Sequence, residues 1–429
     1  MRRVKGSTRL LFATFENITD LVERTHRSTA SKVFRPLVDA APTAAVARGV
    51  EAAHGTTAAG VYTLIRGLGR GVEKLVDLGL ELQDVGSADR GSKAPRDRDA
   101  ADPAAAVPGK ASLADHAESA VNALHGDHLH RVRNPLDLGM SLRRHGKPLP
   151  IEGQSLKEAL PEASGKSVLF VHGLACTEWI WNTSAEAFYG DPQVNFGSLL
   201  ETELGYTPLY LRYNSGRHIS ENGRLLSDLL TRLVAAYPCV VEDIVLVGHS
   251  MGGLVARSAA YYGAKEDADW IGRLRHVVSL GAPHLGSPLE KGVNVLGTLL
   301  GAFDTAGTRV PAELLEARSA GIKDLRFGYT SDEEWQGEDP DGFLADNRQD
   351  LPLVEGVGYT ALAASVTRDP KHPLGVLLGD LLVRLPSAAG QAAEPTRAIP
   401  FRSRRVLPGM SHLDLANHPE VYRVLKEYL

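Results

Sequence analysis

The segment Asp243–Gly253, D-I-V-L-V-G-H-S-M-G-G, decides the fold of this chain. Four apolar residues, Ile244–Val247, run directly into the pattern G-x-S-x-G, which has Ser250 at its centre. Small residues on both sides of a serine permit a sharp, strained turn. Apolar residues then recur at helical spacing as far as Gly263, where a helix can end. The segment therefore predicts a buried strand, a tight turn and a helix that meet at Ser250.

Its place in that turn makes Ser250 a candidate nucleophile. The turn would lift the hydroxyl above the end of the strand, and the N–H of Met251 would face developing negative charge at the start of the helix. The alternative is an ordinary glycine-rich connection, because a five-residue pattern is common in a chain with 43 glycines. The strand–turn–helix context favours the catalytic interpretation.

Composition is that of an ordinary water-soluble protein. The 429 residues are 43% hydrophobic and 23% charged, which is enough for one large core and a second module. A net charge of −5 gives no reason to expect a nucleic acid partner. We expect Cys176 and Cys239 to be unpaired thiols in a reducing compartment rather than a disulfide.

The N-terminus starts basic, but its apolar run ends at Glu16 without a convincing cleavage site. No window approaches 18 consecutive apolar residues, so we expect no membrane-spanning segment. These features predict a cytoplasmic protein without a signal peptide. Peripheral contact with a membrane or a lipid body is left open.

That contact would involve residues 1–85, which we predict to be a helical module. From Val61 to Leu82 the apolar residues follow a spacing of three to four, and residues 1–85 contain 12 Lys and Arg against 9 Asp and Glu. Such a module could lie on an anionic lipid surface, but the simpler interpretation is a helical hairpin that packs against protein. Residues 86–110 hold almost no large apolar side chain, which predicts a flexible linker before a domain at 111–429.

A histidine-rich run, His125–His130, raises the question of a metal site. Its spacing does not match a familiar zinc pattern, and Gly126 interrupts a helical face. We therefore interpret these histidines as solvated side chains of a loop or a helix end, and we expect no metal.

After residue 165 the apolar pattern alternates between strands and helices. The expected strands are Ser167–Val171, Pro208–Tyr213, the Ile244 strand, His276–Leu280, Tyr359–Val366 and Arg404–Leu407. The expected helices are Asn222–Tyr237, the one after Ser250, and His418–Leu429, and a short hairpin at Met140–Ile151 turns at Gly146. Near-continuous apolar strands separated by helices predict an α/β fold whose mostly parallel sheet is covered on both faces.

A serine needs an imidazole to take its proton, and the imidazole needs a carboxylate that fixes its tautomer. In this architecture the chain order is serine, acid, histidine. His412 follows the last strand, whereas His418 reads as the start of the last helix. Asp380 is the favoured acid.

Three other carboxylates compete with Asp380. Asp369 and Asp350 compete by position, and Asp414 lies only two residues past His412, which is too local.

Five separated motifs carry a resemblance to a known superfamily. They are Val171-His-Gly-Leu174, Gly248-His-Ser-Met-Gly252, Gly281-Ala-Pro-His-Leu-Gly-Ser287, Gly379-Asp380 and the late His412. Together they resemble the α/β-hydrolase superfamily. Within it they are most similar to bacterial triacylglycerol lipases and esterases and to inositol-deacylase-like hydrolases, over about residues 111–429.

The resemblance implies an α/β-hydrolase fold and a serine hydrolase that cleaves carboxylic esters, with an ester or lipid as substrate and no cofactor. It makes Ser250 the nucleophile, Asp380 the acid and His412 the base, with the backbone N–H groups of Leu174 and Met251 as the oxyanion hole. An amidase or thioesterase with the same three residues is the first alternative. A membrane- or granule-associated scaffold with a hydrolase-like fold is the second.

Three features of this domain leave choices open. Such lipases often read G-D-G-x-V at the acid, and Leu381 stands here in place of the second glycine. Trp179 and Trp181 could wall an acyl pocket or fill the core. The expected helical cap insertion at 283–353 could be a mobile lid or a fixed cap.

Overall fold

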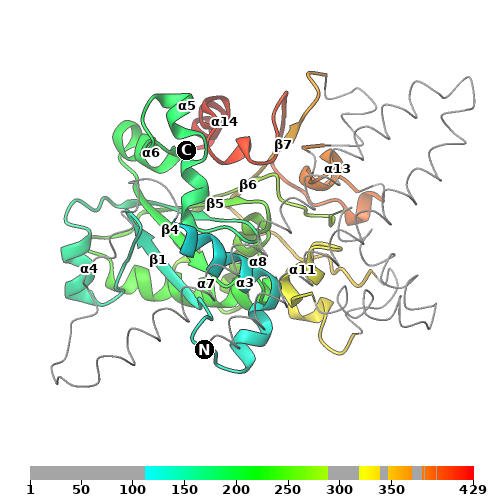
Figure 1. The fold of residues 1–429 in the computed structure, drawn as a ribbon, viewed down its shortest axis with the longest axis horizontal. Helices are drawn as coiled ribbons and strands as arrows, with labels where there is room; N and C mark the ends of the chain where they lie inside the picture. Colours follow the sequence, from blue (N-terminus) through cyan, green and yellow to red (C-terminus); the bar gives the residue numbers. More distant parts are fainter. Residues whose placement is uncertain (1–111, 288–317, 339–345, 370–378, 381, 393) are drawn as a thin grey trace, which may run out of the picture. The chain divides into compact units, whose positions relative to one another are not determined.

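The computed structural model contains an eight-stranded sheet of order β2-β1-β4-β3-β5-β6-β7-β8 (Figure 1). It describes residues 112–287, 318–338, 346–369, 379–380, 382–392 and 394–429. The predicted module at 1–85 and the predicted linker at 86–110 lie outside the described residues, as do residues 288–317 and 339–345 of the predicted cap.

The strands are β1 (Met140–Arg144), β2 (Lys147–Pro148), β3 (Lys166–Val171), β4 (Thr207–Tyr213), β5 (Asp243–His249), β6 (Leu274–Leu280), β7 (Gly358–Ser365) and β8 (Ser403–Pro408). β1 pairs antiparallel with β2 and β4, and all other neighbours pair parallel. The predicted hairpin and the mostly parallel sheet are both confirmed. The predicted strand ends differ from the observed ones by one or two residues.

The α-helices of the described residues are α3 (Leu113–Arg131), α4 (Gly153–Ala159), α5 (Ala185–Tyr189), α6 (Phe196–Leu204), α7 (Ile219–Ala236), α8 (Met251–Lys265), α11 (Ala320–Asp324), α13 (Leu385–Ala388) and α14 (Pro419–Leu425). Short 3₁₀ helices are η1 (Glu178–Asn182), η2 (Ile271–Arg273), η3 (Asp332–Glu334), η4 (Pro395–Arg397), η5 (Asp414–Ala416) and η6 (Lys426–Tyr428). The predicted last helix is therefore shorter than expected, because its final turn tightens to 3₁₀.

Alternate residues of each strand point to opposite faces, and each face carries its own core. On one face Leu169 and Leu246 pack with α7 and α8. On the other, Val168 and Val247 pack with α6 and α14. Figure 1 shows α5, α6 and α14 on one side of the sheet and α7 and α8 on the other. The prediction that both faces are covered is confirmed.

The histidine-rich run lies in the last turns of α3, which is kinked at His125. His130 Nδ1 lies 2.8 Å from Asp137 Oδ2. In the part of the chain that the structure describes, no three His, Cys, Asp or Glu side chains gather closely enough to hold a metal ion.

Cys176 and Cys239 are both free thiols. None of the described helices has the length and apolarity needed to cross a membrane.

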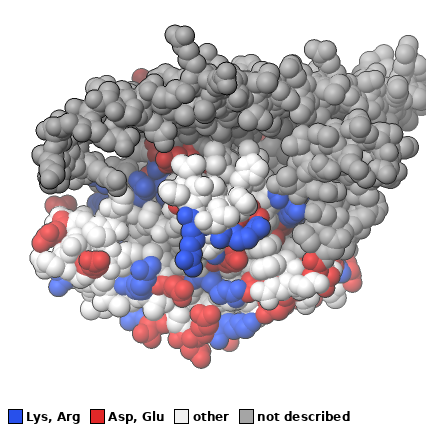
Figure 2. Space-filling model, turned by 60° about the horizontal axis from the view of Figure 1, so that its bottom comes forward, with Lys and Arg blue, Asp and Glu red and all other residues white. Residues whose placement is uncertain are grey.

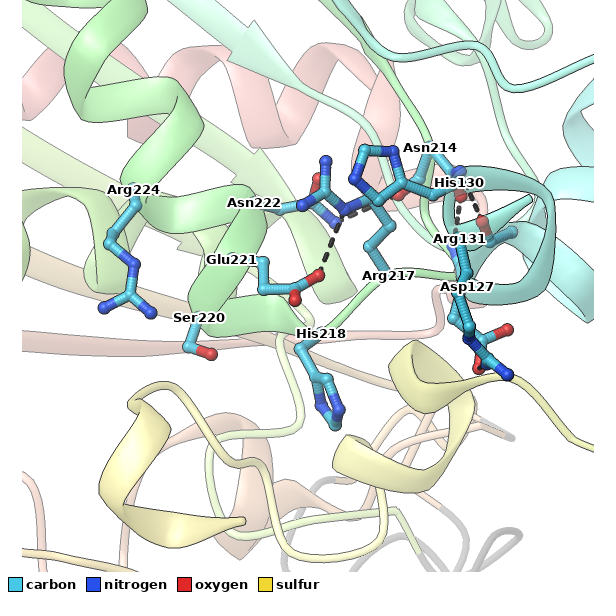
Figure 3. A network of polar contacts seen from close by, with 12 residues as sticks. Asp127, His130, Arg131, Asn214, Arg217, His218, Ser220, Glu221, Asn222 and Arg224 are labelled. Carbon is cyan, nitrogen blue, oxygen red and sulfur yellow. Dashed lines mark hydrogen bonds and ion pairs between the residues drawn. The ribbon is translucent and has the colours of Figure 1, made fainter. Parts of the chain in front are cut away.

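Side-chain amides close the turn between β4 and α7 (Figure 3). The Asn214 amide nitrogen donates to Asp137 Oδ1 at 2.7 Å, and the Asn222 amide nitrogen donates to the carbonyl of Asn214 at 3.0 Å. Arg217 and Glu221 pair one helical turn apart at 3.0 Å. These contacts fix the loop that starts α7, three residues earlier than predicted.

The described segment 318–338 of the insertion is fixed to α7 and α8. The Trp335 indole N–H donates to Ser220 Oγ at 2.9 Å, and Ser258 Oγ donates to the carbonyl of Thr330 at 2.6 Å. Arg224 pairs with Asp332, whose N–H donates to a tyrosine hydroxyl of α8. On the face that Figure 2 turns forward, Lys and Arg are interspersed with Asp and Glu among the described residues, as on an ordinary solvated surface.

A histidine–aspartate pair joins α11 to the start of α7. His218 Nδ1 lies 3.0 Å from Asp324 Oδ1, and the His218 ring stacks on Trp335 with centroids 3.6 Å apart. Burial opposes protonation of His218, but the charge of Asp324 and its hydrogen bond outweigh this and raise the pKa of His218 above its usual value. Burial also raises the pKa of the Asp324 carboxyl.

This pair predicts a stability step near neutral pH. Because the folded protein binds the His218 proton more tightly than the unfolded chain, the pair stabilises below the unfolded pKa, and this contribution is lost as pH rises through the raised folded pKa. The free energy of unfolding, from urea titrations, should fall as the pH rises from about 6.5, the usual histidine pKa, through the raised pKa of folded His218. His218→Gln should lose the step, and His128→Gln, at an exposed histidine, should keep it. If His218→Gln shows the same pH-dependent fall in the free energy of unfolding, the fall comes from the titration of other groups.

Candidate active site

Ser250 lies at the turn between β5 and α8, in a strained backbone conformation. Its φ is +55° and its ψ is −125°, a region that residues with a side chain rarely adopt. The N–H of Ser250 donates to the carbonyl of Leu280 at the end of β6, 2.8 Å away, which holds the turn against the neighbouring strand. The predicted sharp, strained turn is confirmed.

Two glycines make this turn possible. A Cβ on Gly248 would lie 2.4 Å from the Gly252 backbone, and a Cβ on Gly252 would lie 2.1 Å from the carbonyl oxygen of Val171. No side chain fits at either distance. Both glycines of the pattern are therefore required by the close approach of β3, β5 and α8.

Asp380 comes from the segment after β7 and is buried, with 1% of its surface exposed. One carboxylate oxygen, Oδ1, accepts hydrogen bonds from the N–H groups of Leu382 and Val383, at 3.0 and 2.8 Å. The other, Oδ2, lies 2.7 Å from Nδ1 of His412. Both carboxylate oxygens are thus held, whereas Leu381, which departs from the family pattern, lies outside the described residues.

His412 follows β8 and is 4% exposed. Its N–H donates to the carbonyl of Asp380 at 3.1 Å, so backbone and ring contact the same residue. Because Nδ1 faces the carboxylate, it carries the proton of the neutral ring, and Nε2 is left as the basic nitrogen. The structure thus brings Asp380 and His412 together as the sequence predicted.

The competing carboxylates are placed elsewhere. Asp369 and Asp350 are exposed. Asp414 Oδ2 accepts hydrogen bonds from both the N–H and the hydroxyl of Ser411, at 2.8 Å each, so it caps its own turn. In contrast to Asp380, none of the three shows a hydrogen bond to the His412 ring among the described residues.

Gly281 lies between the turn at Ser250 and the side chains of Asp380 and His412. It follows Leu280, which accepts the Ser250 N–H, and a Cβ on Gly281 would lie 3.1 Å from both Asp380 Oδ2 and His412 Cε1. Within the described residues no hydrogen bond joins the Ser250 hydroxyl to the His412 ring. The three predicted residues lie at one edge of the sheet, around Gly281.

Two backbone N–H groups next to the turn at Ser250 have no acceptor among the described residues. Met251 is the first residue of α8, where helical N–H groups have no partner within the helix. Leu174 follows β3, and the neighbouring Gly173 approaches the serine so closely that a Cβ on it would lie 3.0 Å from Ser250 Cβ. Neither N–H donates to another described residue. These are the two N–H groups that the sequence predicted for an oxyanion hole, and that role stays a prediction.

The loop that carries Leu174 is held by buried polar groups. The His172 ring is fully buried, lies 2.8 Å from the carbonyl of Gly173 through Nδ1, and stacks on Tyr213. Burial lowers the pKa of His172 to about 3, so this ring is neutral and braces the loop. Further along, Glu178 and Arg212 form a buried bidentate pair, at 2.6 and 2.8 Å.

Comparison with known proteins gives one family match. Residues 162–336 match the model of a family described as a PGAP1-like alpha/beta domain. The fold is that of an α/β-hydrolase. The superfamily resemblance drawn from the five motifs is thereby confirmed.

No curated protein matches the chain. Among solved structures, the chain is similar to a Bacillus licheniformis lipase in its mature form, with 18% identity over 61% of this chain and 91% of that chain and a TM-score of 0.38. It is also similar to a metagenomic carboxyl esterase (18% identity, 72% and 91% of the two chains, TM-score 0.34) and to a phospholipase from Legionella pneumophila (19% identity, 62% and 59%, TM-score 0.38).

The two tryptophans predicted for the substrate pocket have different places. Trp181 is fully buried between Phe170 and Phe196, which favours the core over an acyl pocket. Trp179 is half-buried and lines a cavity of about 420 Å³ between the β1–β2 turn, η1 and α6, with neighbours such as Asn195. Trp179 as a pocket residue remains a prediction.

Sequence reasoning missed His249, the residue between Gly248 and Ser250. Its ring is 1% exposed, and Nε2 lies 2.9 Å from the backbone carbonyl of His412. The only available signal was its position beside the serine, because the contact spans 163 residues of chain.

The close packing at Gly252 gives a stability prediction. Gly252→Ala must push the α8 start away from β3, so we expect a loss of roughly 1–3 kcal/mol in the free energy of unfolding. Gly272→Ala is the matched control, since a Cβ there meets nothing within 4 Å, and it should stay within about 0.5 kcal/mol. Equal stability of the two variants in urea unfolding would contradict the tight approach.

Proposed function

We propose that this chain is a serine hydrolase that cleaves carboxylic ester bonds through an acyl-enzyme. One observation carries the proposal: the buried 2.7 Å hydrogen bond between Asp380 and His412 lies at the sheet edge where the strained turn presents Ser250. A carboxylate held by two N–H groups, a histidine with one nitrogen left free and a serine at a helix start are the parts that acyl transfer needs.

In the first half-reaction the Ser250 oxygen attacks the ester carbonyl carbon while His412 Nε2 takes the hydroxyl proton. The carbonyl oxygen becomes an oxyanion, which the N–H groups of Leu174 and Met251 stabilise. Collapse of this intermediate breaks the bond to the alcohol, and His412 returns the proton to the leaving oxygen. The hydrogen bond between Ser250 and His412 forms as substrate binds, because catalytic hydrogen bonds are often long in ligand-free enzymes.

In the second half-reaction water attacks the acyl-enzyme. His412 takes a proton from the water, the same two N–H groups hold the second oxyanion, and collapse releases the carboxylic acid as His412 reprotonates Ser250. Asp380 keeps its negative charge throughout and stabilises the imidazolium. No cofactor enters this scheme.

An amidase or thioesterase could use the same three groups, and only substrates separate these classes. A scaffold that has lost catalysis would not require Asp380 to bind both His412 and two N–H groups, so the intact arrangement favours an enzyme. Contact of residues 1–85 with a membrane or lipid body stays a second interpretation of the sequence pattern, beside a helical hairpin that packs against protein.

Hydrolysis of p-nitrophenyl esters across a chain-length series, with matched amides and thioesters, tests the proposed function. Ser250→Ala should lower kcat on the best ester by several orders of magnitude, on the order of 10⁶ in a well-tuned site, because no other nucleophile replaces the hydroxyl. A serine-directed phosphonate should label Ser250 and no other serine. Full activity in a folded Ser250→Ala protein would rule out this mechanism.

The acid is tested by a matched pair of variants. Asp380→Asn should lower kcat by about 10⁴, because an amide favours the wrong tautomer of His412. Asp369→Asn changes an exposed residue and should cost less than about tenfold, or about 1.4 kcal/mol of barrier. The reverse pattern in steady-state kinetics would move the acid to Asp369.

A further inference from the structure

His249 contacts the backbone of the proposed base through a defined nitrogen. Its Nε2 lies 2.9 Å from the carbonyl oxygen of His412, and the two rings are 4.7 Å apart. A carbonyl oxygen only accepts hydrogen bonds, so Nε2 of His249 carries the proton. Its Nδ1 is therefore a bare acceptor.

That acceptor is buried and has no hydrogen-bond partner among the described residues. The indole Nε1–H of Trp181 is a buried donor without a partner in the same part of the chain. The two rings meet edge to face, with centroids 6.4 Å apart and planes at 79°. A lone donor and a lone acceptor on adjacent buried rings complement each other, and each is costly when left unpaired.

The surroundings keep His249 neutral. Burial, followed by the nearby His412, lowers the pKa of His249 to about 3, although the His412 carbonyl and Asp380 act in the opposite direction. His172 is also close and neutral. A neutral ring has one N–H only, so the contact with His412 and a bare Nδ1 must occur together.

We propose that His249 is a positioning residue for His412, and that the Trp181 indole N–H holds His249 in the required tautomer through one buried water. The inference rests on the proposed function of His412 as the base. His412 is then fixed on three sides: its N–H and its Nδ1 by Asp380, and its carbonyl by His249. Only Nε2 stays free for the serine.

Two substitutions at His249 separate this role from mere packing. His249→Leu fills the space but removes the donor, and we expect kcat on the best ester to fall by about 10²-fold with KM changed less than about threefold, as a small misplacement of a catalytic group does. His249→Gln places an amide N–H near the position of Nε2 and should recover most of the loss. Circular dichroism and urea unfolding verify that each variant is folded.

Trp181→Phe keeps an aromatic ring but removes the indole donor, and kcat should fall by about tenfold. The matched control is Trp270→Phe, another fully buried tryptophan whose indole N–H donates to Ser227 on α7, away from the serine. It should lower stability and leave kcat unchanged.

The tautomer is measured without any substrate. In protein labelled with ¹⁵N at histidine, the two ring nitrogens of a neutral imidazole resonate apart, and His249 is assigned by its absence from the His249→Gln spectrum. We expect the Nε2–H form in the native protein and a mixture in Trp181→Phe. Because this readout needs no turnover, a native protein inactive on all esters would refute the proposed function while the tautomer test still decides the hydrogen-bond chain.

Three results would overturn the inference. A His249 ring in the Nδ1–H form excludes donation to the His412 carbonyl. A His249→Leu variant with kcat within about threefold of native, or a His249→Gln variant no better than His249→Leu, leaves packing as its only role. If His249→Leu does not fold, the Gln variant and the spectrum decide. If Trp181→Phe keeps the native His249 tautomer and the native kcat, Trp181 has no part in positioning His249.

Discussion

The site depends on one close contact, between the start of α8 and the end of β3. Gly252 approaches the carbonyl of Val171 so closely that a single Cβ would stand 2.1 Å from it. This approach sets the positive φ of Ser250, since the chain must turn within one residue to enter the helix. The loop after β3, which carries Leu174, is also close to the serine, since a Cβ on Gly173 would lie 3.0 Å from Ser250 Cβ. The close approach of Gly252 to Val171 thus determines both how α8 packs on β3 and where the proposed nucleophile lies.

The described half of the cap is tied to the helices rather than to the sheet edge. Trp335 and Thr330 are hydrogen bonded to Ser220 on α7 and Ser258 on α8, at 2.9 and 2.6 Å. Moving segment 318–338 would break both hydrogen bonds at once. It would also leave the buried hydroxyl of Ser258 and the buried carbonyl of Thr330 without partners, which is costly. For residues 318–338 the fixed cap is therefore the better interpretation.

The sequence predicted the strands around Ser250 well because buried parallel strands are continuous apolar runs, with signals that are local. His412 and Asp380 were also within reach, because the chain order of this architecture restricts the candidates. In contrast, His249 could not be given a role, since its contact with His412 joins residues 163 positions apart and depends on ring orientation. Trp181 was ambiguous for a similar reason: a tryptophan suits a core and a pocket equally, and only the packing around it separates the two.

Burial of the neighbouring histidines bears on the charge that the proposed reaction creates. When His412 takes the serine proton it becomes a cation, and any charged histidine nearby would oppose this step. Burial holds the pKa of His172 and of His249 near 3, so both rings stay neutral at any pH where an esterase would work. The charge on His412 then lies 2.7 Å from the carboxylate of Asp380, which stabilises it. Of the three histidines, His412 is therefore the single proposed base, and His172 and His249 are held neutral in buried hydrogen bonds.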